Sequence, residues 1–127
     1  MNILVVEDHA DTRQALEMLL QVLGHRTRAA RDVEGAVAIA LATDQPFDLL
    51  ISDLQLPDGD GWNLLRRLEA AARRPPQAIA LSGWSSKDDV IKSRSAGFQA
   101  HLVKPTGPRD LEAAVAKASE AIQSAKT

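Results

Sequence analysis

The sequence has no cysteine, which excludes disulfide bonds and thiolate metal sites and fits a reducing compartment. An excess of charge of one sign is also missing. The formal net charge of −2 at pH 7 gives no basic field to attract nucleic acid, so we expect no direct nucleic-acid binding. The amino-terminal segment MNILVVEDHAD lacks a long hydrophobic run, since four consecutive apolar residues are followed by acids. It is neither a signal peptide nor a membrane anchor, and we expect a cytoplasmic protein without membrane insertion.

Glycine is absent from the first turn, which reads EDHAD. A dinucleotide-binding domain needs glycines there to approach a pyrophosphate, so that class is excluded. What the sequence does contain is typical of a globular protein, with 45% apolar and 25% charged residues. A chain of 127 residues can bury an independent core, and we find no repeat, low-complexity tract or linker. We therefore predict one domain over residues 1–127.

Short apolar runs without polar alternation indicate strands that are covered on both faces. Four such runs are ILVV (3–6), LLIS (49–52), AIAL (78–81) and HLV (101–103). A fifth candidate, RTRAA (26–30), has the mixed character of a strand at the edge of a sheet.

Segments with helical spacing separate these runs. Their predicted buried faces are Ala15, Leu16, Leu19 and Leu23; Val33, Val37, Ala40 and Leu41; Leu64, Leu65, Leu68 and Ala72; and Leu111, Val115, Ala118 and Ile122. A further helix from about 87 to 96 has only three apolar positions, so we expect it to be the most loosely packed. Strand and helix alternate five times, which predicts an α/β protein with an open, doubly wound parallel sheet and right-handed crossovers.

In such sheets ligands bind beyond the carboxyl ends of the strands. The runs end in Glu7 and Asp8, in Asp53, in Ser82, and in Lys104. Three carboxylates brought to one edge repel one another unless a cation intervenes, and magnesium prefers such hard oxygen ligands. A lysine and a hydroxyl group can neutralise phosphoryl oxygens. The set is what phosphoryl transfer onto an aspartate requires.

The segments ILVVEDHADTR, DLLISDLQLPDGDGW, ALSGW and AGFQAHLVKP carry these residues in order. Together they resemble the receiver domain of bacterial two-component response regulators over essentially the whole chain. The last two segments look most like receivers attached to hybrid sensor histidine kinases. The resemblance implies a flavodoxin-like (βα)5 fold with strand order 2-1-3-4-5.

The resemblance also implies roles for individual residues. Asp53 would accept a phosphoryl group from a phosphohistidine on a sensor histidine kinase or a histidine phosphotransfer protein. Asp8 and Asp53 would bind Mg²⁺, with Mn²⁺ as an alternative, together with the backbone carbonyl of Gln55, and Glu7 would act through water. Lys104 would pair with the phosphoryl oxygens.

A conformational switch is implied as well. Ser82 would move to bond a phosphoryl oxygen, and His101 stands where the family usually has an aromatic switch residue. Because histidine titrates, we expect its movement to be weaker or to depend on pH. Phosphorylation would change the face formed by the fourth helix, fifth strand and fifth helix. The Lys104–Pro105 bond is expected to be cis, against a base rate of about 5%.

Two side chains beside the phosphorylation site are predicted to influence the lifetime of the phosphate. They are Gln55, two residues after Asp53, and Trp84, whose bulk would shield an acyl phosphate from water. The domain would act in signalling and catalyse only its own phosphorylation and dephosphorylation. Because the sequence stops after the fifth predicted helix, the expected output is a partner protein or an adjacent domain.

Two other functions stay open from the sequence. A haloacid-dehalogenase-like phosphatase also uses an aspartate nucleophile, but it needs an acid two residues later, where this chain has Gln55. A pseudo-receiver would bind a partner without phosphorylation, although the complete set of acids, serine and lysine argues against it. Asp58 and Asp60 are predicted to be loop residues, and Trp62 is predicted to pack at the start of the third helix.

Overall fold

The computed structural model describes residues 1–83 and 86–126 and is built on a five-stranded parallel sheet. Its strands are β1 (Asn2–Val6), β2 (Arg26–Ala30), β3 (Leu49–Asp53), β6 (Gln77–Ser82) and β7 (Ala100–Val103). They lie in the order β2-β1-β3-β6-β7, and every neighbouring pair is parallel. Because β4 and β5 form a separate hairpin, this is the predicted 2-1-3-4-5 order of a doubly wound α/β protein, which is confirmed.

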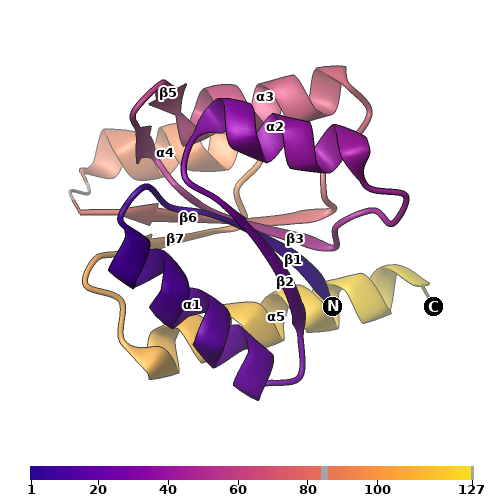
Figure 1. Ribbon diagram of the computed structural model, residues 1–127. Coiled ribbons are helices and arrows are strands. Elements are labelled where there is room, and N and C mark those ends of the chain that lie inside the picture. The colour runs from indigo at the N-terminus through magenta and orange to yellow at the C-terminus, as the bar shows by residue number, and fades with distance from the viewer. Residues whose placement is uncertain (84–85, 127) are drawn as a thin grey trace.

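Helices cover both faces of the sheet (Figure 1). One face carries α2 (Val33–Ala42), α3 (Gly61–Ala70) and α4 (Lys87–Ala96), and the other carries α1 (Ala10–Val22) and α5 (Pro108–Lys126). Within residues 1–83 and 86–126, no helix is long and apolar enough to span a bilayer.

The core consists of two apolar layers, one on each face of the sheet. The strand residues Leu4 and Leu50 pack toward α2 and α3, whereas Ile3 and Ile51 pack toward α1 and α5. All five residues of β3 are buried, which explains why its sequence lacks polar alternation. Asp53, the last residue of this buried central strand, therefore lies at the carboxyl edge of the sheet in a well-packed position.

Some of the predicted helix faces are wrong in detail. Ala15 faces solvent, because the buried residues of α1 are Leu16 and Leu20. Leu41 is 52% exposed, because the buried side of α2 runs along Val33, Ala36, Val37 and Ala40. Ala72 lies beyond the end of α3 and has a φ of 58°, so it does not continue the helical face.

The hairpin that follows Asp53 was not predicted. It pairs β4 (Gln55–Leu56) with β5 (Gly59–Asp60) in antiparallel fashion. Its turn is fixed to α2, since the Asp58 carboxylate accepts hydrogen bonds from the backbone amides of Val33 at 2.8 Å and Glu34 at 3.0 Å. These bonds lower the pKa of Asp58. The hairpin is thus tied to an element 24 residues away in the chain.

Candidate functional site at the carboxyl edge of the sheet

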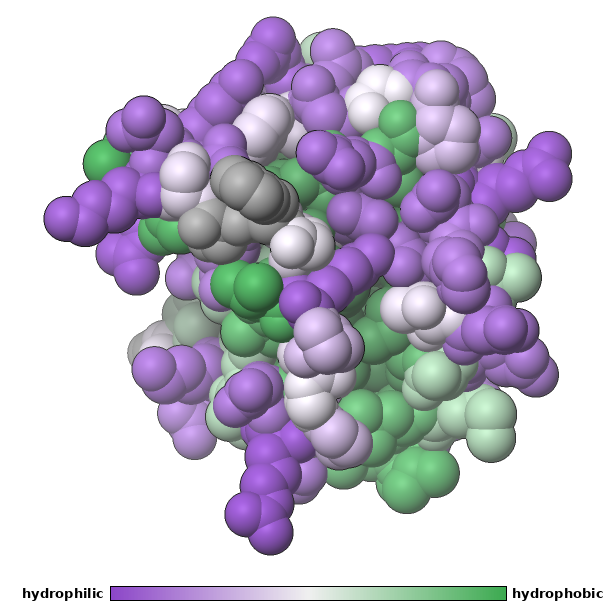
Figure 2. Space-filling view, turned by 90° about the vertical axis from the view of Figure 1, so that its left-hand side faces the viewer, coloured by the Kyte–Doolittle hydropathy of each residue, from purple (hydrophilic) through white to green (hydrophobic). Residues whose placement is uncertain are grey.

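Strand register brings four distant segments to one edge. Val6 lies opposite Ser52, so Glu7 and Asp53 follow neighbouring strand positions. On the other side, Ser82 pairs with Val103, and the Lys104 amide donates to the Ser82 carbonyl at 2.7 Å. Figure 2 looks onto the left-hand side of Figure 1, where β6 ends; its surface is largely hydrophilic in the upper half and has a hydrophobic patch in the lower half, which carries α1 and α5.

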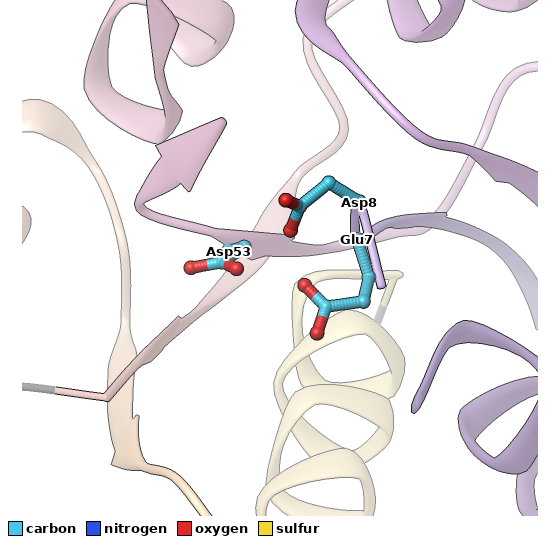
Figure 3. A group of neighbouring side chains, drawn as sticks. All are labelled: Glu7, Asp8 and Asp53. Carbon is cyan, nitrogen blue, oxygen red and sulfur yellow. The ribbon is translucent and has the colours of Figure 1, made fainter. Parts of the chain in front are cut away.

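Three carboxylates meet at this edge. Glu7, Asp8 and Asp53 each offer one oxygen atom, and these oxygens lie within 4.8 Å of one another. Figure 3 shows the three side chains turned toward a common region from the ends of β1 and β3. Glu7 and Asp53 are buried, at 1% and 6% exposure, whereas Asp8 is exposed. The predicted cluster of acids is therefore present, with one acid open to solvent.

Lys104 joins the two buried acids. Its Nζ donates to Glu7 Oε1 at 2.6 Å and to Asp53 Oδ2 at 2.8 Å. Burial alone would lower the pKa of Lys104, but the bonds to Asp53 and Glu7 outweigh it and raise the pKa above its ordinary value. The lysine is therefore held in its charged form against the acid that was predicted to be the nucleophile.

Glu7 is the acid with the most unusual environment. Burial, reinforced by a side-chain interaction with Asp53, raises the pKa of Glu7 to about 7, although Lys104 acts in the opposite direction. Its Oε2 atom is buried and accepts no hydrogen bond from the described residues. An orphaned acceptor of this kind is satisfied when a water molecule or an ion occupies the space beside it.

The second oxygen of Asp53 is also held. Its Oδ1 accepts a hydrogen bond from the backbone amide of Gln55 at 3.2 Å. The backbone of Asp53 is also approached closely, because Gly61 begins α3 so near to β3 that a Cβ there would lie 2.8 Å from the Asp53 carbonyl oxygen. Glycine is therefore required for the close approach of this helix to the acid.

Comparison with known proteins agrees with this geometry. The model of the family described as the response regulator receiver domain matches residues 3–116. The chain is a response regulator receiver domain. It is 35% identical to response regulator protein PilR of Pseudomonas aeruginosa over 115 residues, which cover 91% of this chain and 25% of PilR. It is 34% identical to virulence sensor protein BvgS of Bordetella pertussis over 113 residues, 84% of this chain and 9% of BvgS.

A solved structure agrees in fold as well. The signal receiver domain of a signal transduction histidine kinase from Syntrophus aciditrophicus has a TM-score of 0.82 and 30% identity. The similarity covers 95% of this receiver domain and 91% of that chain. By contrast, this receiver domain spans a quarter or less of the length of PilR and BvgS.

The predicted switch residues of the receiver domain lie on β6 and β7, the two strands that follow β3 in the sheet. Ser82 is buried at the end of β6, while His101 in β7 is partly buried. Both ring nitrogens of His101 are buried and bond to no described residue. Burial lowers the pKa of His101, and the charge of Asp89 on α4 opposes this shift. The Lys104–Pro105 peptide bond is cis, and Trp84 lies outside the described residues.

Sequence reasoning missed several residues that support the site of the receiver domain. Asp58 lies in the turn of the hairpin, as predicted, and accepts hydrogen bonds from the first amides of α2. The prediction is wrong for Asp60, which lies in β5 and caps α3 by accepting from the Asn63 amide at 2.7 Å. Arg13 donates to the Glu7 carbonyl at 2.9 Å. The spacing of Asp60 and Asn63 is a local cap signal, whereas the partners of Asp58 and Arg13 depend on tertiary contacts.

The raised pKa of Glu7 predicts a pH dependence of stability. The folded state keeps a proton on Glu7 that the unfolded chain, with a pKa near 4.5, releases. The contribution of Glu7 to the free energy of unfolding is therefore fully present below pH 4.5 and is lost as pH rises through about 7. Between pH 5 and pH 8 in EDTA, we expect the free energy of unfolding of the wild type to fall relative to Glu7→Gln by about 1 kcal/mol, allowing for solvent screening. Urea denaturation at both pH values measures this difference.

The matched control is Glu112→Gln, which changes an exposed glutamate on α5. Its free energy of unfolding should change between the two pH values as that of the wild type does. Equal pH dependence of the wild type and Glu7→Gln would contradict the raised pKa of Glu7.

Proposed function

We propose that this receiver domain is the phosphoacceptor of a two-component phosphorelay and that Asp53 takes the phosphoryl group from a phosphohistidine. The observation that carries the proposal is the position of Lys104, whose ammonium bonds both Glu7 and Asp53 beside a cluster of three carboxylates. An ordinary surface aspartate has neither a partly buried ammonium partner nor neighbouring acids. The arrangement suits a nucleophile whose developing charge must be neutralised.

The donor atoms fit a hard divalent cation. Carboxylate oxygens within 4.8 Å of one another repel unless positive charge is added, and Glu7 Oε2 lacks a partner among the described residues. We propose that Asp8, Asp53 and the backbone carbonyl of Gln55 hold Mg²⁺, or Mn²⁺ in its place, with Glu7 acting through a bound water. When bound, the ion would neutralise charge on the phosphoryl oxygens.

Each residue of the site then has its own role in phosphoryl transfer. An oxygen of the Asp53 carboxylate attacks phosphorus as the bond from phosphorus to the histidine nitrogen breaks, and the electron pair stays with the imidazole. Lys104 would follow the transferring group, because its ammonium already lies 2.8 Å from Asp53 Oδ2. The Gln55 amide keeps the other carboxylate oxygen in position. The result is an aspartyl phosphate, made and later hydrolysed by the domain itself.

Phosphorylation adds about 1.5 to 2 negative charges at Asp53. We propose that Ser82 turns to bond one of the new oxygens and that His101 follows, which shifts the face formed by α4, β7 and α5. Coupling of this kind is worth ~1–3 kcal/mol. Phosphorylation would therefore change the affinity for the partner by degrees and would not switch binding fully on or off. The predicted roles of Trp84 and of the Gln55 side chain in phosphate lifetime stay predictions.

The partners follow from the same proposal. The donor would be a sensor histidine kinase or a histidine phosphotransfer protein, and the output would be a partner protein or an adjacent domain. The similarity to BvgS, described as a sensor protein, supports a place beside a kinase, and the similarity to PilR supports a place in a response regulator. One domain over residues 1–127 and a cytoplasmic location complete the proposal. No observation favours the phosphatase or the pseudo-receiver.

Labelling tests the proposal directly. The purified chain is incubated with acetyl phosphate in Mg²⁺ or in EDTA, and the intact mass is measured. We expect one added phosphoryl group in Mg²⁺, located by peptide mapping in the segment that contains Asp53, and almost none in EDTA. Labelling that is equal in EDTA, or that maps to another segment, would overturn the proposal.

A further inference from the structure

Helix α4 is the most weakly anchored helix of the face that it shares with α2 and α3. Ser93 is its one fully buried residue, whereas α2 and α3 each bury four. Its large apolar residue Ile91 is 62% exposed. The ends of α4 are well defined by a capping box between Ser86 and Asp89 and by Gly97. Local caps therefore define where the helix begins and ends, but little apolar contact fixes its position.

Trp62 supplies two polar contacts that fix α4. Its indole Nε1 donates a hydrogen bond to Ser93 Oγ at 3.0 Å. The ammonium of the adjacent Lys92 lies 4.0 Å from the centroid of the same ring. Two consecutive residues of α4 thus hold one side chain, and Ser93 is fully buried whereas Trp62 is partly buried. A hydrogen bond also requires a defined geometry, which apolar contact does not.

Trp62 itself stands on a rigid support. It is the second residue of α3, directly after Gly61, and it packs against the apolar core. The Asp60 cap precedes it, and the hairpin before that is tied to α2 by Asp58. With Ser82 and Asp89, the indole also lines a cavity of about 270 Å³ beside the phosphoacceptor loops. Trp62 therefore lines the same cavity as the switch serine, and its Nε1 bonds α4.

We propose that Trp62 restrains α4 in its unphosphorylated position through Ser93 and Lys92, and so sets how readily phosphorylation shifts the output face. The inference rests on the proposed function, because it concerns the response to modification of Asp53. If the contacts exist in the resting position and are weakened in the activated one, removing them favours the activated position. Replacing a residue that only packs would not favour the activated position of α4 over the resting one.

Two variants remove the contacts without emptying the core. Ser93→Ala deletes the acceptor of the Trp62 hydrogen bond, and Lys92→Met deletes the charge over the ring and keeps the aliphatic stem. Each has a matched control on the same helix, because Ser95 and Lys87 are exposed. The controls are Ser95→Ala and Lys87→Met. The double variant at positions 92 and 93 tests whether the two contacts act together.

The first measurement is the affinity for beryllofluoride in Mg²⁺, a mimic of the phosphoryl group, followed by two-dimensional NMR. We expect Ser93→Ala to bind about fivefold more tightly than the wild type, as the loss of one resting-state hydrogen bond implies. Lys92→Met should bind about twofold more tightly. Both controls should match the wild type. Unchanged or weaker binding by Ser93→Ala would overturn the restraint while leaving the role of Asp53 intact.

The second measurement needs no modification of Asp53. Hydrogen exchange of α4 backbone amides is compared in Ser93→Ala and Ser95→Ala without beryllofluoride. We expect exchange at least about threefold faster in Ser93→Ala, confined to α4. If the wild type does not bind beryllofluoride, the proposed function fails, and the exchange rates alone decide the restraint. Equal exchange in the two variants would overturn it.

Discussion

Asp53→Asn is expected to abolish labelling by acetyl phosphate while leaving a folded protein. An amide is a far poorer nucleophile than a carboxylate, and Asp53 is the acid whose two oxygens are held by Lys104 and by the Gln55 amide. The loss should be complete within the sensitivity of intact-mass measurement. It would be the largest functional effect of any single substitution in the site.

The fold should survive this change because Glu7 and Lys104 remain paired. The interactions with Asp53 help to raise the pKa of Glu7, so their removal lets that pKa fall toward its ordinary value. We therefore expect the melting temperature of Asp53→Asn at pH 8 to equal or exceed that of the wild type. Asp44→Asn, at an exposed aspartate, is the control for loss of one charge. Persistent labelling of Asp53→Asn would mean that another residue is the acceptor.

Lys104→Met is expected to cost both activity and stability. The ammonium is the cation that bonds Asp53 Oδ2, so phosphorylation by acetyl phosphate should slow by about 100-fold, the usual effect of losing one charge-stabilising donor. Two buried acids also lose their shared partner. Breaking such a pair is costly, and we expect about 3 kcal/mol less stability at pH 8.

The stability loss should depend on pH in a defined direction. Without the ammonium, the pKa of Glu7 rises further, because Lys104 acts to lower it. A protonated Glu7 needs no cation, so the loss should be smaller at pH 6 than at pH 8. Urea denaturation of wild type, Lys104→Met and the exposed control Lys117→Met at both pH values measures this. A loss that is equal at the two pH values would show that Lys104 contributes packing rather than charge.

Much of the fold could be predicted because local and tertiary requirements agree. A continuous apolar run such as the one ending at Asp53 fits only a strand that is covered on both faces, and β3 is buried along its whole length. Parallel register then places the residues after each run at one edge. The meeting of Glu7, Asp8, Asp53 and Lys104 was therefore predictable from their positions in the sequence.

Other features depend on contacts that no local pattern records. The strands β4 and β5 have two residues each, too few to show periodicity. The partners of Asp58 lie 24 and 25 residues away, and those of Trp62 lie on another helix. Lys104 was predicted to meet a phosphoryl group, but its simultaneous bond to Glu7 follows from side-chain placement within the folded edge.

The hydrogen bonds between Asp58 and the first amides of α2 indicate where fluorescent dyes could be attached to follow α4. They join the hairpin, α2 and α3 into one block, to which Arg67 and Glu34 add an ion pair across the two helices. A dye attached at the exposed Gln45, in the loop after α2, would mark the end of this block. Paired with a second dye at the exposed Ile91 of α4, it would give an energy-transfer sensor for the proposed movement of α4.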